Sequence, residues 1–330
     1  MAVFTKLNQA DIFNVQNIFG FKKITSFKGI KKGIENTNYT VATKNKKYVL
    51  TIFESRVNNK DLPYFMKLMD ALSKKGIKCP SPIKNKFGKY IFNLKRKKAC
   101  LVSFLEGKDK KKLLEKDLLV IGKKIGLMHK KLTKIKLKRK NSFSPLKINS
   151  LINKINLKNS KLPKNLKEEM KESFRDISKK WPKGITSSVI HGDLFIDNIF
   201  FHKGKFGGFI DFYFSAYDFQ AYELAICMNS LCFNKTKNKF KFNKKKASKL
   251  FKGYESIRKL KPEEKRSMKI LCKGSALRYL ATRAYDYVNT PKNILIKKKD
   301  PSEYIQKLRF HDSIERFEAV SYTHLRAHET

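Results

Sequence analysis

The pattern of apolar and polar positions changes character about a third of the way along the chain. Before that point short β-rich runs alternate with turns, and ITSFKGIKKGIENTNYTVATKNKKYVLTIFE holds three runs separated by GIKKGIEN and KNKK. Apolar residues then recur at helical spacing from Leu62 to Leu72, and Gly76 ends that helix. KCPSPIKNKFGKYIFNLKRKKACLVSFLEG returns to strands, with Phe87 and Gly88 near a hairpin turn. The pattern therefore predicts a small β-rich N-terminal lobe.

After Gly107 the pattern is mainly helical, interrupted by VIHGDLFIDNIFFHKGKFGGFIDF. The lysine-rich segment 132–165, with its Pro and Ser residues, is expected to be an exposed connection. We predict an α+β architecture with a nucleotide-binding lobe over 1–102, a hinge over 103–107 and a catalytic and substrate lobe over 108–318. Residues 319–330 contain no lysine and two of the six histidines, and we interpret them as a non-native tail.

The charge of the chain first suggests a polyanion as partner. Its 330 residues carry a formal net charge of +47, but 64 of the 75 basic residues are Lys and only 11 are Arg. Base reading and bidentate phosphate binding favour Arg, and no zinc-finger, RRM-like or KH-like signature accompanies the charge. We therefore expect no specific nucleic-acid partner, although anionic small molecules such as nucleotides would be attracted.

The cysteines and the apolar runs indicate a cytoplasmic protein. Five cysteines, an odd number without a C-x-x-C pair, predict reduced thiols and neither a disulfide framework nor a zinc site. The N-terminal residues show no export signal, and no apolar run approaches the ~20 residues of a membrane span. Partner chains and oligomeric state are not indicated.

One stretch departs from the basic character of the chain. From Trp181 to Asp218 three Lys stand against four Asp, a net charge of −1, where average composition would give about +5. Within it, NIFFHKGKFGGFIDF predicts a hairpin that brings Asn198 and Asp211, at its two ends, close together. Asp193 stands nearby on the loop HGD, where Gly192 relieves steric limits.

These residue types fit phosphoryl transfer. Such a reaction needs one acceptor near the substrate hydroxyl and oxygen ligands for Mg²⁺, which bridges the phosphate oxygens. The spacing H-x-D-x-x-x-x-N, followed by I-D, matches kinase catalytic loops. We assign Asp193 as catalytic acceptor, Asn198 and Asp211 as metal ligands, and His191 as a structural brace of the loop. Asp197 could reach the substrate or be a solvated carboxylate, and Asp218 and Glu223 are expected to cap and orient the following helix.

A nucleotide-binding lobe is the natural companion of such a loop. Gly29 and Gly33 lie in a turn whose N–H groups could cover phosphates, although most such glycine pairs are ordinary hairpin turns. Thr51 occupies the strand position where kinases place their phosphate-binding lysine. Three nearby cations are candidates to replace that lysine: Lys28, Lys47 and Arg56. An interlobe hinge whose backbone could contact adenine is predicted at Ser103, Phe104 and Leu105.

Together these motifs resemble one family. FKGIKKGIENTNYTV, GIKCPSPI, HGDLFIDNIFF, GFIDFYF and ALRYLATRAYDYVNTP are similar to homoserine kinases of the aminoglycoside/choline phosphotransferase-like type, colinearly from Ala2 to about Phe317. The resemblance implies a bilobal protein-kinase-like fold and transfer of the ATP γ-phosphate to the side-chain hydroxyl of L-homoserine, in threonine biosynthesis. Thr51 departs from the wider kinase pattern, in which a lysine stands here, but it looks usual for this branch of the family.

The substrate and the reaction class leave alternatives open. A homoserine site needs a cation for the carboxylate, and Arg283 is our candidate, with ordinary pairing between helices as the alternative. A kinase for choline, an aminoglycoside or a sugar would share the loop chemistry, and a choline site would want an aromatic cage. An inactive kinase-like polyanion-binding protein and a metallohydrolase using His191 and Asp193 are more remote alternatives.

Overall fold

The computed structural model describes residues 3–31, 36–54, 57–133, 135–158, 160–289 and 299–315. The chain forms two compact units, of which the first contains Met1–Lys108 with Ile199–Tyr213 and the second Asp109–Asn198 with Phe214–Thr330. Gly33, Arg56 and the predicted tail 319–330 lie outside the described residues.

The first unit is built on a five-stranded sheet in the order β1-β2-β3-β5-β4, with every neighbouring pair antiparallel. Its strands are β1 (Ile24–Gly29), β2 (Thr37–Thr43), β3 (Lys47–Ile52), β4 (Ile91–Leu94) and β5 (Lys97–Ser103), and its helices are α1 (Gln9–Phe19), the 3-10 turn η1 (Asn59–Asp61) and α2 (Leu62–Lys74). The three predicted β-rich runs are β1 to β3, and the predicted helix is α2. Gly76, with φ of 72°, follows α2 as expected.

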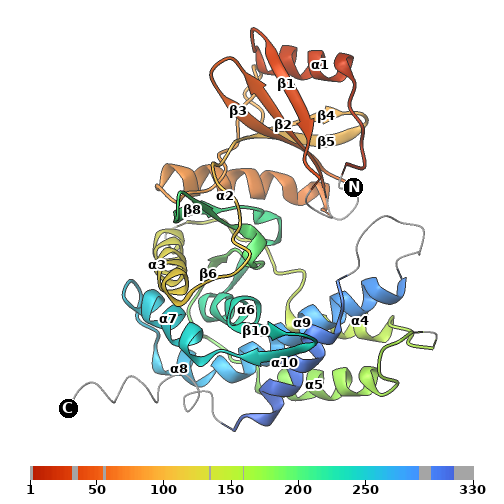
Figure 1. The fold of residues 1–330 in the computed structure, drawn as a ribbon, viewed down its shortest axis with the longest axis vertical. Helices are drawn as coiled ribbons and strands as arrows, with labels where there is room; N and C mark the ends of the chain where they lie inside the picture. The colour runs from red at the N-terminus through yellow and green to blue at the C-terminus, as the bar shows by residue number, and fades with distance from the viewer. Residues whose placement is uncertain are drawn as a thin grey trace. The chain divides into compact units, whose positions relative to one another are not determined.

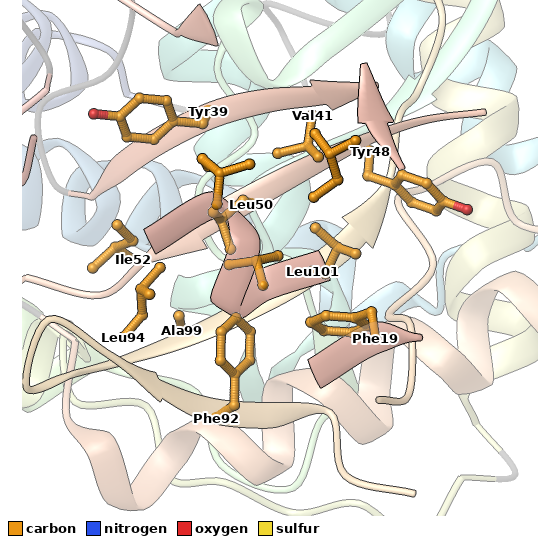
Figure 2. Close-up of a cluster of buried hydrophobic side chains, with 13 residues drawn as sticks. Phe19, Tyr39, Val41, Tyr48, Leu50, Ile52, Phe92, Leu94, Ala99 and Leu101 are labelled. Atoms are coloured by element: carbon orange, nitrogen blue, oxygen red, sulfur yellow. The ribbon is translucent and has the colours of Figure 1, made fainter. Parts of the chain in front are cut away.

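The two faces of this sheet differ because side chains alternate along each strand. On one face Tyr39 and Val41 of β2 and Leu50 of β3 join the buried residues of α1 in a single apolar cluster. Figure 2 shows this cluster, with Phe19 of α1 beside the strands. The alternate residues of β2 and β3, among them Asn38 and Thr51, therefore point to the opposite face.

Two tight hairpins complete the first unit. β4 and β5 turn at Lys95 and Arg96, which both adopt left-handed backbone with φ of 50° and 59°. The second hairpin, predicted from the sequence, joins β7 (Ile199–His202) to β8 (Lys205–Phe209) and pairs Ile199 with Phe209. It attaches to the unit through the backbone, because the Phe209 N–H donates to the Lys78 carbonyl oxygen at 3.0 Å.

The second unit is mainly helical. Its helices are α3 (Glu115–Leu132), α4 (Asn149–Asn153), α5 (Leu166–Lys180), α6 (Gln220–Leu231), α7 (Lys244–Glu255), α8 (Pro262–Arg266), α9 (Met268–Asn289) and α10 (Ser302–Ser313). Short 3-10 turns are η2 (Pro145–Lys147), η3 (Ile196–Asn198) and η4 (Phe212–Phe214), and the boundary between the units falls within η4. The strand pairs are β6 (Ser187–Ile190) with β9 (Ala216–Phe219) and β10 (Phe233–Thr236) with β11 (Lys239–Phe242). Helix α9 packs against α5, α6 and α10 (Figure 1). Because α9 is covered on several sides, its residues are buried almost without interruption from Met268 to Ala281.

The segment 132–165 was expected to be an exposed connection, and this expectation is wrong for its middle part. Ile148, Ile152 and Ile155 are all buried, and α4 packs against α5 and α9. The lysine-rich composition of the segment as a whole hid this short run of isoleucines at helical spacing. All five cysteines are free thiols, as predicted. Within the described ranges, no helix combines the length and the apolar character that crossing a membrane requires.

Candidate active site

The loop after β6 begins with a backbone conformation that requires glycine. Gly192 has φ of 78°, and a Cβ at this position would lie 2.8 Å from the carbonyl oxygen of Phe214. The left-handed region is costly for residues with a Cβ, and here the added carbon would also meet backbone that cannot move aside cheaply. The loop HGD can therefore make its sharp turn only with glycine in the middle.

Glu223 of α6 fixes this loop through hydrogen bonds to its backbone. Its carboxylate is fully buried and accepts hydrogen bonds from the backbone N–H groups of His191 and Gly192, the latter at 3.1 Å. The sequence had suggested that Glu223 caps its own helix, and the structure corrects this, because the side chain serves the loop. Nearby, His129 Nε2 lies 3.9 Å from Glu223, and burial lowers the pKa of His129 although Glu223 opposes the shift.

Asp193 presents a carboxylate that is fixed at both oxygens. The Tyr279 hydroxyl donates to Oδ1 at 3.0 Å, and the Asn198 Nδ2 donates to Oδ2 at 3.2 Å. Burial raises the pKa of Asp193, while the positive charges of Arg278 and Lys299 oppose this rise. Since each carboxylate oxygen has two acceptor positions, Asp193 can still accept a hydrogen bond from a substrate hydroxyl.

His191 and Asn198 are arranged around Asp193. His191 Nδ1 accepts the backbone N–H of Asp193 at 3.3 Å, in line with the predicted bracing role. Asn198, at the end of η3, also donates its Nδ2 to the Asp193 carbonyl oxygen at 2.8 Å. Because the amide nitrogen of Asn198 faces Asp193, its Oδ1 oxygen is directed away and has the donor chemistry that Mg²⁺ prefers. Asp197, in the same turn, is half-buried.

Asp211 follows the β7–β8 hairpin in the first unit, two residues after the end of β8. Its φ is 64°, which is left-handed backbone on a residue other than glycine. Such conformations cost roughly 1–3 kcal/mol and concentrate at functional sites. Burial raises the pKa of the neighbouring Tyr213 well above its usual value, with contributions from Cys100 and Asp211. The hairpin thus ends in a carboxylate whose position is paid for in backbone strain.

The sheet face opposite the apolar cluster carries the predicted nucleotide residues. The Thr51 hydroxyl donates to Asn38 Oδ1 at 2.7 Å, so a neutral polar pair occupies the position of the usual kinase lysine. Lys28 of β1 pairs with Thr40 of β2, and Thr40 points to the same face as Asn38, two residues away. On β3, Lys47 points to the same face as Thr51. Two of the three candidate cations therefore lie on the Thr51 side of the sheet.

The remaining nucleotide residues are only partly available to a ligand. Gly29 ends β1 opposite Tyr39, and an added Cβ would lie 2.7 Å from Val3. In the predicted hinge the Ser103 N–H donates to the Ser81 carbonyl oxygen at 2.8 Å, and the Phe104 N–H donates to that of Lys47 at 3.2 Å. A role of this segment in binding adenine stays a prediction, and the two N–H groups of Ser103 and Phe104 are already used within the protein.

Comparison with known proteins identifies the family. Residues 26–245 match the model of the phosphotransferase enzyme family. The chain is 38% identical over 314 residues to a homoserine kinase of Sinorhizobium medicae (strain WSM419), covering 95% of each chain. It is also 38% identical over 314 residues to a homoserine kinase of Agrobacterium fabrum (strain C58), covering 95% of this chain and 97% of that protein. The chain belongs to the homoserine kinases of the phosphotransferase enzyme family.

Solved structures resemble this kinase in fold. An amicoumacin kinase in complex with AMP-PNP, Ca²⁺ and Ami superimposes with a TM-score of 0.71 at 14% identity, over 93% of this chain and 92% of that one. A choline kinase from Streptococcus pneumoniae gives 0.65 at 16% identity, over 93% of this chain and 100% of that one. At these identities the likeness concerns the fold alone, and it confirms the predicted α+β, protein-kinase-like class.

Arg283, the predicted carboxylate partner, has an acidic partner of its own in the kinase. Its Nη1 lies 2.6 Å from Glu303 of α10, and its guanidinium lies 4.4 Å from the centre of the Tyr304 ring. The structure thus contains the pairing between helices that the sequence left open as the alternative. A role of Arg283 or Asp197 in substrate binding stays a prediction.

Two residues that support the catalytic loop were missed by sequence reasoning. Arg278 is buried and donates to the Gly192 carbonyl oxygen at 2.9 Å, and Tyr279 donates to Asp193. Both lie on α9, 86 residues from their partners along the chain. Their segment was recognised as a family motif, but no spacing rule connects a helix residue with a loop so distant in sequence.

Proposed function

We propose that this protein transfers the γ-phosphoryl group of ATP to the side-chain hydroxyl of L-homoserine, producing ADP and O-phospho-L-homoserine. The observation that carries the proposal is the coincidence of two findings: identity of 38% over nearly the whole length of homoserine kinases, and an intact HGDLFIDN loop whose Asp193 is fixed at both carboxylate oxygens. Location in the cytoplasm and a role in threonine biosynthesis follow from this function.

Asp193 is the proton acceptor in this proposal. Its carboxylate orients the homoserine hydroxyl and takes its proton as the bond to phosphorus forms. Burial raises the pKa of Asp193, which makes the carboxylate a better proton acceptor than an exposed one, although nearby positive charges limit the shift. Tyr279 and Asn198 hold the carboxylate in one orientation, so that little reorganisation is needed during the reaction.

Asn198 and Asp211 are proposed as ligands of Mg²⁺. Both offer oxygen atoms as ligands. The Asn198 amide nitrogen donates to Asp193, which leaves its Oδ1 for the metal, and the Asp211 carboxylate is carried on a left-handed backbone conformation. When bound with ATP, the metal would be held by these two side chains and would reduce the negative charge of the phosphates that repels the nucleophile. The Thr51 side of the sheet, with Lys28 and Lys47, and the segment Ser103–Leu105 are proposed to contact the nucleotide.

A substrate panel tests the function. ADP release from Mg-ATP is measured with L-homoserine, L-serine, choline and an aminoglycoside at equal concentrations. We expect turnover to be fastest with L-homoserine. Equal or faster turnover with choline or an aminoglycoside would overturn the assignment of substrate and leave the family and the fold intact.

A further inference from the structure

L-Homoserine carries a carboxylate that a selective site must recognise with a cation. The described part of the second unit offers four cations that lie near Asp193 or interact with residues beside it: Arg278, Arg283, Lys299 and Lys307. A substrate carboxylate needs a cation that is accessible and not already neutralised, because recruiting a buried or paired cation would break existing contacts. The four differ clearly by this criterion.

Three of the four cations are committed to the protein. Arg278 is buried, bound to the Gly192 carbonyl oxygen, and stacked 4.7 Å from the centre of the Tyr279 ring. Arg283 is paired with Glu303. Lys307 is buried, contacts the same Glu303, and donates to the Asn229 carbonyl oxygen at 2.6 Å. These contacts fix the loop and join α9 to α10, and each would be lost if the side chain turned to a ligand.

Lys299 is different. It is exposed, lies three residues before α10, and forms no ion pair with any residue of the described ranges. Its ammonium lies 5.3 Å from the centre of the Phe195 ring, and Phe195 follows Asp193 by two residues on the catalytic loop. Phe195 packs on Tyr279, and the Tyr279 hydroxyl donates to Asp193, so a chain of contacts connects this ammonium with the catalytic carboxylate.

The surroundings of Phe195 define where a substrate would lie. Its half-buried ring packs edge-to-face on Tyr279, 4.9 Å between centres, and Tyr279 in turn holds Asp193. A small amino acid with its hydroxyl on Asp193 has its carboxylate about one extended side chain away, on the order of 5 Å. A flexible lysine held loosely over an aromatic ring can adjust to that position without breaking any ion pair.

We propose that Lys299 binds the α-carboxylate of the substrate and thereby makes the enzyme selective for amino alcohols that carry a carboxylate. This inference rests on the proposed function and adds to it a residue that determines specificity. Lys299 acts on binding and not on the chemical step, because it contacts the end of the substrate that does not react.

The test removes either the Lys299 ammonium, by mutation, or the substrate carboxylate, by use of an analogue. Wild type, Lys299→Met, Lys299→Arg and Arg283→Met are compared on L-homoserine and on 3-aminopropan-1-ol, which keeps the hydroxyl and the ammonium but lacks the carboxylate. Lys252→Met, an exposed lysine on α7, is the control for loss of one positive charge. We expect Lys299→Met to raise the KM for L-homoserine about 10- to 100-fold, the value of a hydrogen bond between charged groups. The kcat for L-homoserine should change little, and kcat/KM for 3-aminopropan-1-ol should hardly change.

The remaining outcomes are equally decisive. Lys299→Arg should keep the preference for L-homoserine, because it keeps the charge, and Lys252→Met should behave as wild type. Loss of the preference in Arg283→Met with its retention in Lys299→Met would assign the carboxylate to Arg283 and overturn the inference. An equal loss on both substrates in Lys299→Met would also overturn it. Failure of the wild-type enzyme to phosphorylate L-homoserine would instead refute the proposed function itself.

Discussion

Replacement of Glu223 by Gln should damage stability and catalysis together. The fully buried carboxylate accepts two backbone N–H groups of the catalytic loop, from His191 and Gly192. Gln keeps the shape and one acceptor oxygen but turns an NH₂ group toward one of these donors. Loss of charge-assisted hydrogen bonds costs about 2–4 kcal/mol, and relief from burying a charge offsets part of this, leaving about 1–3 kcal/mol. For a chain of 330 residues that corresponds to a decrease in melting temperature of about 1–4 °C.

The catalytic effect of the same change follows from the position of Asp193, which comes directly after Gly192. A displacement of the loop by about 1 Å can lower kcat on the order of 100-fold. Thermal unfolding and steady-state ADP release with L-homoserine measure the two effects. Glu264→Gln is a matched control: Glu264 is equally buried and accepts from Arg258 at 2.6 Å and from the Lys261 N–H at 2.8 Å. These partners do not belong to the catalytic loop.

We expect Glu264→Gln to lower the melting temperature by a similar amount while the folded enzyme keeps its kcat. A Glu223→Gln enzyme with unchanged kcat would refute the role of Glu223 as anchor of the loop. So would a loss of kcat that is equally large in the control, because it would then reflect general destabilisation.

Two further predictions concern other buried groups. Tyr279→Phe removes the hydrogen bond to Asp193 Oδ1 while keeping the ring, so kcat should fall about tenfold with little change in the KM for ATP, and an unchanged kcat would show that Asn198 alone orients the carboxylate. His311 is neutral in the folded protein, because burial lowers its pKa to about 3 from a usual value of 6.5. The contribution of neutral His311 to the free energy of unfolding is therefore fully present above pH 6.5. It is lost as the pH falls toward 3, and the loss is about 2 kcal/mol at pH 5. Unfolding titrations at pH 7.5 and pH 5 should show this loss in wild type and a smaller one in His311→Gln, and equal losses would contradict the assignment.

Much of the first unit could be predicted because its signals are local. A stretch of about ten residues is enough to recognise β1 to β3, α2 and the β7–β8 hairpin, from alternating apolar residues, helical spacing or a Lys-Gly turn. The hairpin turn expected near Phe87 and Gly88 was placed wrongly, because the β4–β5 turn lies at Lys95 and Arg96, which adopt left-handed backbone without the usual Asn or Gly. The buried face of α4 was missed because the helix has only five residues within a lysine-rich segment, and only its packing against α5 and α9 reveals it.

The candidate site divides in the same way. The contact between Asp193 and Asn198 could be predicted because the two residues lie five positions apart on one loop, with a spacing that kinases share. Tyr279 and Glu223 could not, because they approach the loop from helices 86 and 31 residues away along the chain. Arg283 was a reasonable candidate as a cation in the segment ALRYLATRAYDYVN, but its acidic partner Glu303 comes from α10, which only the packed structure brings close.

Transfer of phosphate to L-homoserine, followed directly, tests the central claim. Wild type and Asp193→Asn are incubated with Mg-ATP and L-homoserine, and O-phospho-L-homoserine is quantified by ³¹P NMR or mass spectrometry beside ADP. Asn keeps the shape of Asp193 and its contact with Tyr279 but cannot accept the proton, and general-base assistance is worth roughly 10²–10⁴ in rate. The account predicts one phosphohomoserine per ADP in wild type, and a kcat lower by at least about 100-fold in Asp193→Asn with a nearly unchanged KM for ATP. ADP formed without phosphohomoserine, or a variant as fast as wild type, would contradict it.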